Sequence, residues 1–137
     1  MFGIVIVAHG GLAQEYLLAA EHVVGVNPTV QAISIYPKDD VDEKEDQIKM
    51  ALSNVNTGSG VIIVTDIHGS TPANLALKAS KGSNFKVIFG ANLPLIVKLI
   101  KARNLSADDA VKLAVNAGKK YISCASTILS KSNTNCD

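Results

Sequence analysis

The sequence predicts an α/β protein with a doubly wound, mostly parallel sheet of five strands and helices on both faces. Apolar runs of strand length alternate with stretches of helical period along most of the chain. The first and third runs are apolar throughout, which is typical of central parallel strands covered on both faces. The chain of 137 residues is 47% hydrophobic and 18% charged, a balance that suits one folded domain.

The expected strands and helices follow one another in repeated units. The expected strands are at residues 2–8, 30–36, 60–65, 85–90 and 121–127. The expected helices are at residues 11–25, 40–55, 71–80, 92–103 and 106–118. Units of this size favour the flavodoxin-like strand order 2-1-3-4-5. We therefore expect a domain at residues 1–128, followed by a polar, flexible tail at residues 129–137.

Capping and breaking residues mark several helix ends. Gly25 is expected to end the first helix, and Pro72 lies near the first position of the third, where a missing N–H costs little. Ser106 is expected to cap the last of these helices, with Asp109 at its third position and Gly118 as its end.

Composition and charge exclude several classes of protein. No apolar run approaches the roughly 20 residues of a membrane span, and the N-terminus lacks the features of a signal peptide. Cys124 and Cys136 form no CxxC pair, so we expect a reducing cytoplasm and neither a disulfide framework nor a zinc site. Residues 1–60 carry 3 basic and 8 acidic residues (−5), and residues 61–137 carry 10 and 4 (+6). The basic half lacks an Arg-rich cluster with aromatics, so no nucleic-acid partner is expected.

The candidate site lies where the first and third strands end, at His9 and Asp66. In doubly wound sheets, ligands bind beyond the carboxyl ends of the strands. Because neighbouring strands lie about 4.8 Å apart, Asp66 can accept a hydrogen bond from one ring nitrogen of His9. That bond fixes the tautomer and leaves the other nitrogen free to attack or to accept a proton. The alternative is a histidine that only closes the strand as a structural donor.

The stretch "DIHGSTPAN" at residues 66–74 adds a second element to this site. Gly69 allows a tight turn, and Ser70 or Thr71 can cap the following helix. Hydroxyls and free N–H groups at a helix N-terminus bind anions, so we expect a phosphate seat beside His9. The alternative is that Ser-Thr-Pro only begins a helix.

Other site motifs are missing or weak. The sequence has no Walker A loop, no G-x-G-x-x-G after the first strand and no G-x-S-x-G nucleophile elbow. His9, Asp66 and His68 are three candidate metal ligands, but they lack a tight spacing motif. We therefore predict no metal at this site.

Three stretches together resemble a known family. In this order and at these separations, "IVIVAHGGLA", "VTDIHGSTPAN" and "GANLPLIVKLI" resemble the IIA component of the mannose family of the bacterial phosphotransferase system. The resemblance covers roughly the first 125 residues. It implies a doubly wound sheet in a cytoplasmic homodimer, with the C-terminal strand, here residues 121–127, packed against the partner.

The resemblance also implies a reaction. His9 matches the histidine that accepts a phosphoryl group from the histidine phosphocarrier protein and passes it to a IIB partner. Asp66 matches the aspartate that orients this histidine, and Thr71 matches the hydroxyl residue of the family's turn, beside Gly69 and Ser70. No metal or nucleotide cofactor is needed at this step. The implied link to a membrane transporter complex is at most peripheral.

The chain departs from the family pattern at two positions and leaves alternatives open. Ser70 stands where many members have a second glycine, so it is strained if that position needs a positive φ. His68 replaces a residue that is often aromatic or apolar, and it could adjust the pH response or the partner contact. The resemblance leaves two recipients open, a IIB protein or a regulated enzyme. The alternatives are a non-catalytic regulatory docking module and the phosphocarrier subunit of a dihydroxyacetone kinase, in which a serine typically follows the histidine.

Overall fold

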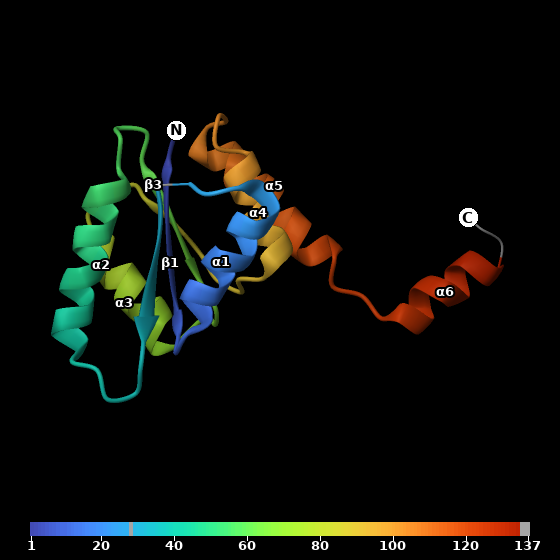
Figure 1. Cartoon of the computed structure of the whole chain (residues 1–137), viewed down its shortest axis with the longest axis horizontal. Helices are drawn as coiled ribbons and strands as arrows, with labels where there is room; N and C mark the ends of the chain where they lie inside the picture. Colours follow the sequence, from blue (N-terminus) through green and yellow to red (C-terminus); the bar gives the residue numbers. More distant parts are fainter. Residues whose placement is uncertain (28, 135–137) are drawn as a thin grey trace.

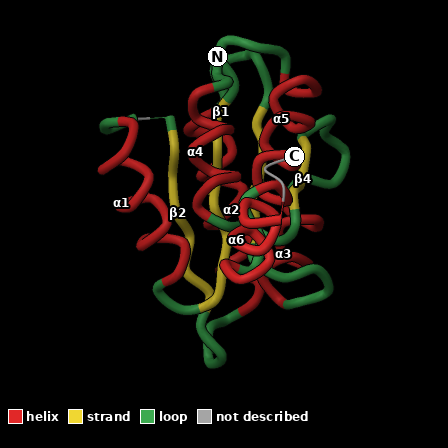
Figure 2. Tube along the Cα trace, turned by 90° about the vertical axis from the view of Figure 1, so that its right-hand side faces the viewer, coloured by secondary structure: helices red, strands yellow, loops and turns green. Residues whose placement is uncertain are grey.

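The computed structural model describes residues 1–27 and 29–134, and it shows a parallel sheet between two layers of helices (Figure 1). The strands are β1 (Gly3–His9), β2 (Val30–Ile35), β3 (Val61–Thr65) and β4 (Lys86–Ile88). They lie side by side in one sheet (Figure 2), in the order β2-β1-β3-β4. Every neighbouring pair is parallel. The predicted α/β class is confirmed, and the order is that expected for the first four strands.

Helices cover both faces of the sheet. One layer contains α1 (Leu12–Val24), α4 (Leu93–Lys101) and α5 (Ala107–Lys120), and the other contains α2 (Val41–Val55) and α3 (Thr71–Ala79). Figure 1 shows α2 and α3 on the left of the sheet and the other three on the right. No helix among the described residues is both long and apolar enough to cross a membrane.

The two central strands are buried on both sides. Ile4 and Ile6 of β1 pack into the core on the α1, α4 and α5 face, whereas Val5 and Val7 pack into the core on the other face. This division follows from the alternation of side chains along a strand. It explains why β1 is a continuous apolar run, which ends at the exposed His9.

Side-chain caps start three of the helices. Asp40 Oδ1 accepts from the N–H of Asp42 (2.9 Å) and the N–H of Glu43 at the start of α2. Asn92 Oδ1 accepts from the N–H of Leu95 at 3.0 Å and starts α4. The predicted cap at Ser106 is present, with its hydroxyl oxygen accepting from the N–H of Asp109 at 3.2 Å. α1 ends at Val24, immediately before Gly25, as predicted.

The predicted end of the last of these helices at Gly118 is wrong, because α5 continues to Lys120. Gly118 instead lies against α4. A Cβ at this position would lie 3.2 Å from Asn92 Oδ1 and 3.2 Å from Leu95 Cβ. The glycine therefore allows α4 and α5 to approach closely, and it does not end the helix.

The predicted fifth strand at residues 121–127 is also wrong within the described chain, whereas the expectation that this segment lies at a dimer interface stays a prediction. Residues 122–124 have no regular structure, and α6 (Ala125–Thr134) follows them. Figure 1 shows α6 standing away from the rest of the molecule. A strand needs a neighbouring strand for its N–H and C=O groups, and after α5 the chain leaves the sheet. The predicted domain boundary at residue 128 falls within α6. The flexible tail at residues 129–137 stays a prediction, and its residues 135–137 lie outside the described chain.

Candidate functional site

The carboxyl ends of β1 and β3 bring His9 and Asp66 together. The two strands pair in parallel up to Val7 and Thr65, so the residues that follow meet at the same edge of the sheet. The expected hydrogen bond is present, with His9 Nδ1 2.7 Å from Asp66 Oδ2. The backbone N–H of His9 donates to the same oxygen at 2.9 Å. The imidazole is 50% exposed, whereas the carboxylate side chain is 7% exposed.

The environment of Asp66 favours a charged carboxylate. Burial raises the pKa of Asp66, but hydrogen bonds from the backbone N–H and the ring of His9 lower it, together with the His9 charge and the N–H of Ile67. The balance leaves the pKa of Asp66 below its ordinary value. A charged carboxylate accepts a hydrogen bond from a protonated Nδ1. In a neutral imidazole that is protonated at Nδ1, the lone pair lies on Nε2.

The turn after Asp66 places a glycine, a serine and a threonine in sequence. Gly69 has φ +84°, so the positive φ of this turn falls on a glycine. Ser70 has φ −83° and ψ 170°, so the strain considered at this position does not arise. The Ser70 hydroxyl donates to the carbonyl oxygen of Ile67 at 2.7 Å. Ser70 is the N-cap residue of α3, but within the described residues its side chain accepts no capping hydrogen bond.

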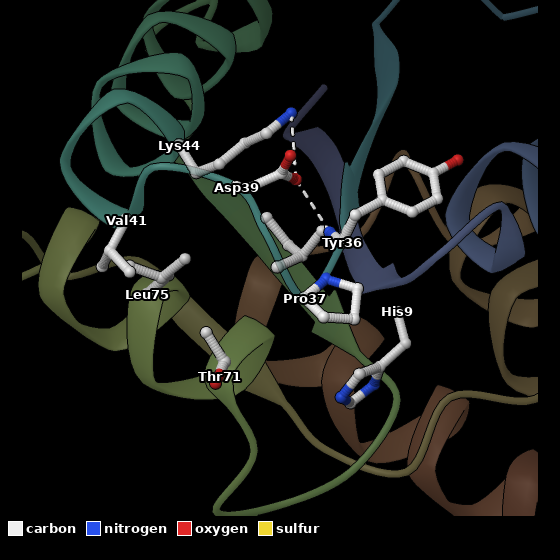
Figure 3. A pocket seen from close by; sticks show the side chains of 9 residues that line it. His9, Tyr36, Pro37, Asp39, Val41, Lys44, Thr71 and Leu75 are labelled. Carbon is white, nitrogen blue, oxygen red and sulfur yellow. Dashed lines mark hydrogen bonds and ion pairs between the residues drawn. The ribbon is translucent and has the colours of Figure 1, made fainter.

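A pocket of about 330 Å³ opens beside His9 (Figure 3). Its lining residues come from β1, β2, the following turn, α2 and α3: His9, Ile35, Tyr36, Pro37, Asp39, Val41, Lys44, Thr71 and Leu75. Figure 3 shows His9 and Thr71 at one end and the Lys44–Asp39 pair at the other. The Lys44 Nζ to Asp39 Oδ2 distance is 3.7 Å. Thr71 is the first residue of α3, so the exposed N-terminus of this helix borders the pocket.

Reasoning from the sequence missed the turn at residues 36–39, which forms one wall of this pocket. Asp39 Oδ2 accepts from the N–H of Tyr36 at 2.7 Å, and the N–H of Asp39 donates to the Tyr36 carbonyl oxygen at 3.1 Å. The signal for it was available, since a Pro and an Asp directly after a strand are typical of a turn. The end of a strand next to β1 is also where a doubly wound sheet binds its ligands.

His68 does not complete a metal site. Its ring stacks on Phe89, with ring centroids 4.5 Å apart and an interplanar angle of 27°. Across residues 1–27 and 29–134, no three His, Cys, Asp or Glu side chains are grouped so that they could hold a metal ion. The groups that the geometry places beside His9 are therefore the carboxylate of Asp66 and the N-terminus of α3.

The fold and this geometry define a class of protein. It is an α/β domain with an accessible histidine, oriented by a carboxylate, at the carboxyl edge of a parallel sheet. A family model described as the PTS system fructose IIA component matches residues 3–116. The chain belongs to this family, the IIA components of the phosphotransferase system, which are phosphoryl carriers of a sugar-transport system. The resemblance stated from the sequence is confirmed.

Individual relatives agree with this assignment. The PTS system mannose-specific EIIAB component of Escherichia coli (strain K12) is 31% identical over 122 residues, 87% of this chain and 38% of the relative. The chain thus spans well under half of that relative's length. The PTS system sorbose-specific EIIA component of Lacticaseibacillus casei is 27% identical, over 96% of this chain and 93% of the relative. The crystal structure of phosphotransferase system component EIIA from Streptococcus agalactiae has a TM-score of 0.83 at 23% identity, covering 93% of this chain and 99% of that one, and supports the fold.

Proposed function

We propose that the chain carries a phosphoryl group on Nε2 of His9. The observation that carries this proposal is the hydrogen bond from His9 Nδ1 to Asp66, which leaves Nε2 on an exposed ring. In the proposed step, the Nε2 lone pair forms the N–P bond while the bond from phosphorus to the donor's imidazole breaks. Asp66 orients the ring and stabilises the charge that it gains.

The phosphate seat in this proposal is the turn at Gly69, Ser70 and Thr71. Free N–H groups in the first turn of α3 and the helix dipole favour a negatively charged group at this end. The Thr71 hydroxyl shares the pocket with His9. The Ser70 hydroxyl is bonded to Ile67, so its part in the proposal is to shape the turn. These groups stabilise the charge on the transferring phosphoryl oxygens.

Family membership supports the proposed partners. The donor is the histidine phosphocarrier protein, and the recipient is a IIB protein or a regulated enzyme. The proposed transfer takes place in the cytoplasm, with at most peripheral association with a membrane transporter complex.

Intact-mass spectrometry at mildly alkaline pH tests the proposal. The protein is incubated with phosphoenolpyruvate, enzyme I and the histidine phosphocarrier protein. We expect one acid-labile phosphoryl group on the wild type and none on His9→Ala. His22→Ala, which removes an exposed histidine from α1, is the matched control and should be phosphorylated like the wild type.

Asp66→Asn belongs in the same experiment. An amide does not favour the Nδ1–H tautomer as a carboxylate does, so we expect transfer to slow by at least about 100-fold. An unchanged rate would contradict the role of Asp66. Folded wild-type protein that gains no mass from an active donor would contradict the carrier proposal. Partner binding without transfer would then favour the non-catalytic docking module.

We also propose that the carrier is a homodimer held together by the segment after α5. The support is the exposure of three apolar side chains in a short segment: Ile122 is 73%, Ile128 is 51% and Leu129 is 61% exposed. Large apolar side chains that stay exposed in one copy become favourable to bury when a partner covers them. The family resemblance points to a second copy as the partner.

A further inference from the structure

The loop between β4 and α4, residues 89–92, is held by hydrogen bonds to three other parts of the molecule. The N–H of Ala91 donates to the Thr65 carbonyl oxygen at 2.9 Å. The Tyr16 hydroxyl donates to the Ala91 carbonyl oxygen at 3.1 Å. Asn92 Nδ2 donates to the Gly118 carbonyl oxygen at 3.0 Å. The loop therefore joins α1 and α5 to the carboxyl end of β3.

The end of β3 is the part of the chain from which Asp66 projects. Thr65, the preceding residue, is fully buried, and its hydroxyl donates to the Ile88 carbonyl oxygen at 3.2 Å. The hydroxyl of Thr65 is thus bound to β4, and its carbonyl oxygen is bound to the loop that follows β4. A displacement of Ala91 would be passed to Thr65 and from there to Asp66.

Tyr16 is well placed to hold this loop. Its ring is partly buried against the core between the sheet and α1, α4 and α5. Burial raises the pKa of Tyr16, and the negative charge of Asp66 raises it further, so the phenol stays a proton donor.

We propose that Tyr16 is a positioning residue for the His9–Asp66 pair, acting through Ala91 and Thr65. Its hydroxyl holds the 89–92 loop against the end of β3 and thereby fixes the direction from which the carboxylate meets the imidazole. Tyr16 lies in the helix that directly follows His9, so one segment supplies the nucleophile and a support for its orienting group. The effect on the rate of phosphoryl transfer rests on the proposed function, whereas the effect on the position and pKa of Asp66 does not.

Tyr16→Phe tests the inference because it keeps the ring and removes only the hydroxyl. The matched control is Ser106→Ala, which removes the N-terminal cap of α5. Gly118 lies near the other end of this helix, so the control lowers stability without removing a contact of the 89–92 loop. Two quantities are measured for each variant: the rate at which His9 is phosphorylated by the histidine phosphocarrier protein, and the pKa of Asp66 from the NMR shift of its carboxyl carbon. Urea unfolding shows whether the two variants are comparably destabilised.

For Tyr16→Phe we expect transfer about tenfold slower, since small misplacements of catalytic groups are costly. We also expect the pKa of Asp66 to rise toward its ordinary value as the hydrogen bonds to it loosen, while Ser106→Ala leaves both quantities as in the wild type. An unchanged pKa of Asp66 in Tyr16→Phe would overturn the inference, whatever the rate. Equal slowing in both variants would assign the effect to stability and overturn it as well. If the wild type accepts no phosphoryl group, the proposed function fails and the pKa of Asp66 alone decides the role of Tyr16.

Discussion

At the scale of single residues, the site depends on a carboxylate that is charged although it is mostly buried. Three hydrogen bonds end on Asp66, two from His9 and one from the N–H of Ile67 at 3.0 Å. Removing a charge from water is costly unless it is bonded in this way. The same bonds that offset this cost also fix the imidazole, so stability and orientation come from one group of contacts.

The lowered pKa of Asp66 predicts how stability depends on pH. A carboxyl whose pKa is lower in the folded than in the unfolded protein stabilises the fold fully above its unfolded value, about 3.9. This contribution is lost as the pH falls through the lower, folded value. We therefore expect the difference in free energy of unfolding between wild type and Asp66→Asn to shrink from about pH 5 to about pH 2. Urea unfolding across this range measures it, and a constant difference would argue against the charged carboxylate.

The contact between His9 and Asp66 was predictable because it depends on strand order alone. Two residues at the ends of neighbouring parallel strands must lie close together. The partners of the Tyr16 and Ser70 hydroxyls were not predictable, because they depend on where a helix and a turn pack. In the sequence, Tyr16 reads only as an apolar position on α1, and Ser70 as a cap.

At the scale of helices and strands, the sequence predicts the residue ranges of the elements better than it predicts which side of a helix is buried. The helical spacing of apolar residues in 11–25 places Leu12 and Val23 on the apolar side of the first helix, yet these are 39% and 55% exposed. The fully buried positions of α1 are Ala13 and Ala20. These two small residues pack into the core that α1 shares with the sheet, α4 and α5. Hydrophobicity alone does not show which face of an apolar helix packs into the core.

Close packing between β1 and α2 makes a prediction for Gly3. A Cβ at this position would lie 2.3 Å from the Val55 carbonyl oxygen and 2.6 Å from Val55 Cγ2. Backbone atoms cannot move away as a flexible side chain can, so α2 would have to shift. We expect Gly3→Ala to lower the free energy of unfolding by about 1–3 kcal/mol, measured by urea unfolding. A variant as stable as the wild type would show that α2 adjusts without cost.

At the scale of the whole molecule, the α/β architecture was predictable because β1 and β3 need apolar residues on both faces. The region after α5 was not, because its structure does not depend on the core. The segment at residues 121–127 has β-branched and aromatic residues that suit a strand, but among the described residues of one copy no strand lies beside it. All of the side chains from Tyr121 to Leu129 are exposed, so the two cores place no constraint on it.

This exposure supplies a physical argument for the proposed dimer. α6 has 10 residues. Isolated helices shorter than about 12–15 residues are marginal in water, and most helical stability in proteins comes from packing of an apolar face. The described side chains of α6 contact no core in a single copy. A partner surface that covers Ile128 and Leu129 would supply the missing packing.

Light scattering coupled to size-exclusion chromatography tests this argument with a double variant, Ile128→Ser and Leu129→Ser. The wild type should have twice the mass of one chain, and the variant should have the mass of one chain at the same concentration. Because residues 121–129 are exposed in a single copy, the variant should keep the circular dichroism of the α/β body. Ser126→Ala, a change on the same helix that removes no apolar group, should stay dimeric. A wild type with the mass of one chain at all concentrations, or a double variant that stays dimeric, would show that these two side chains do not hold two copies together.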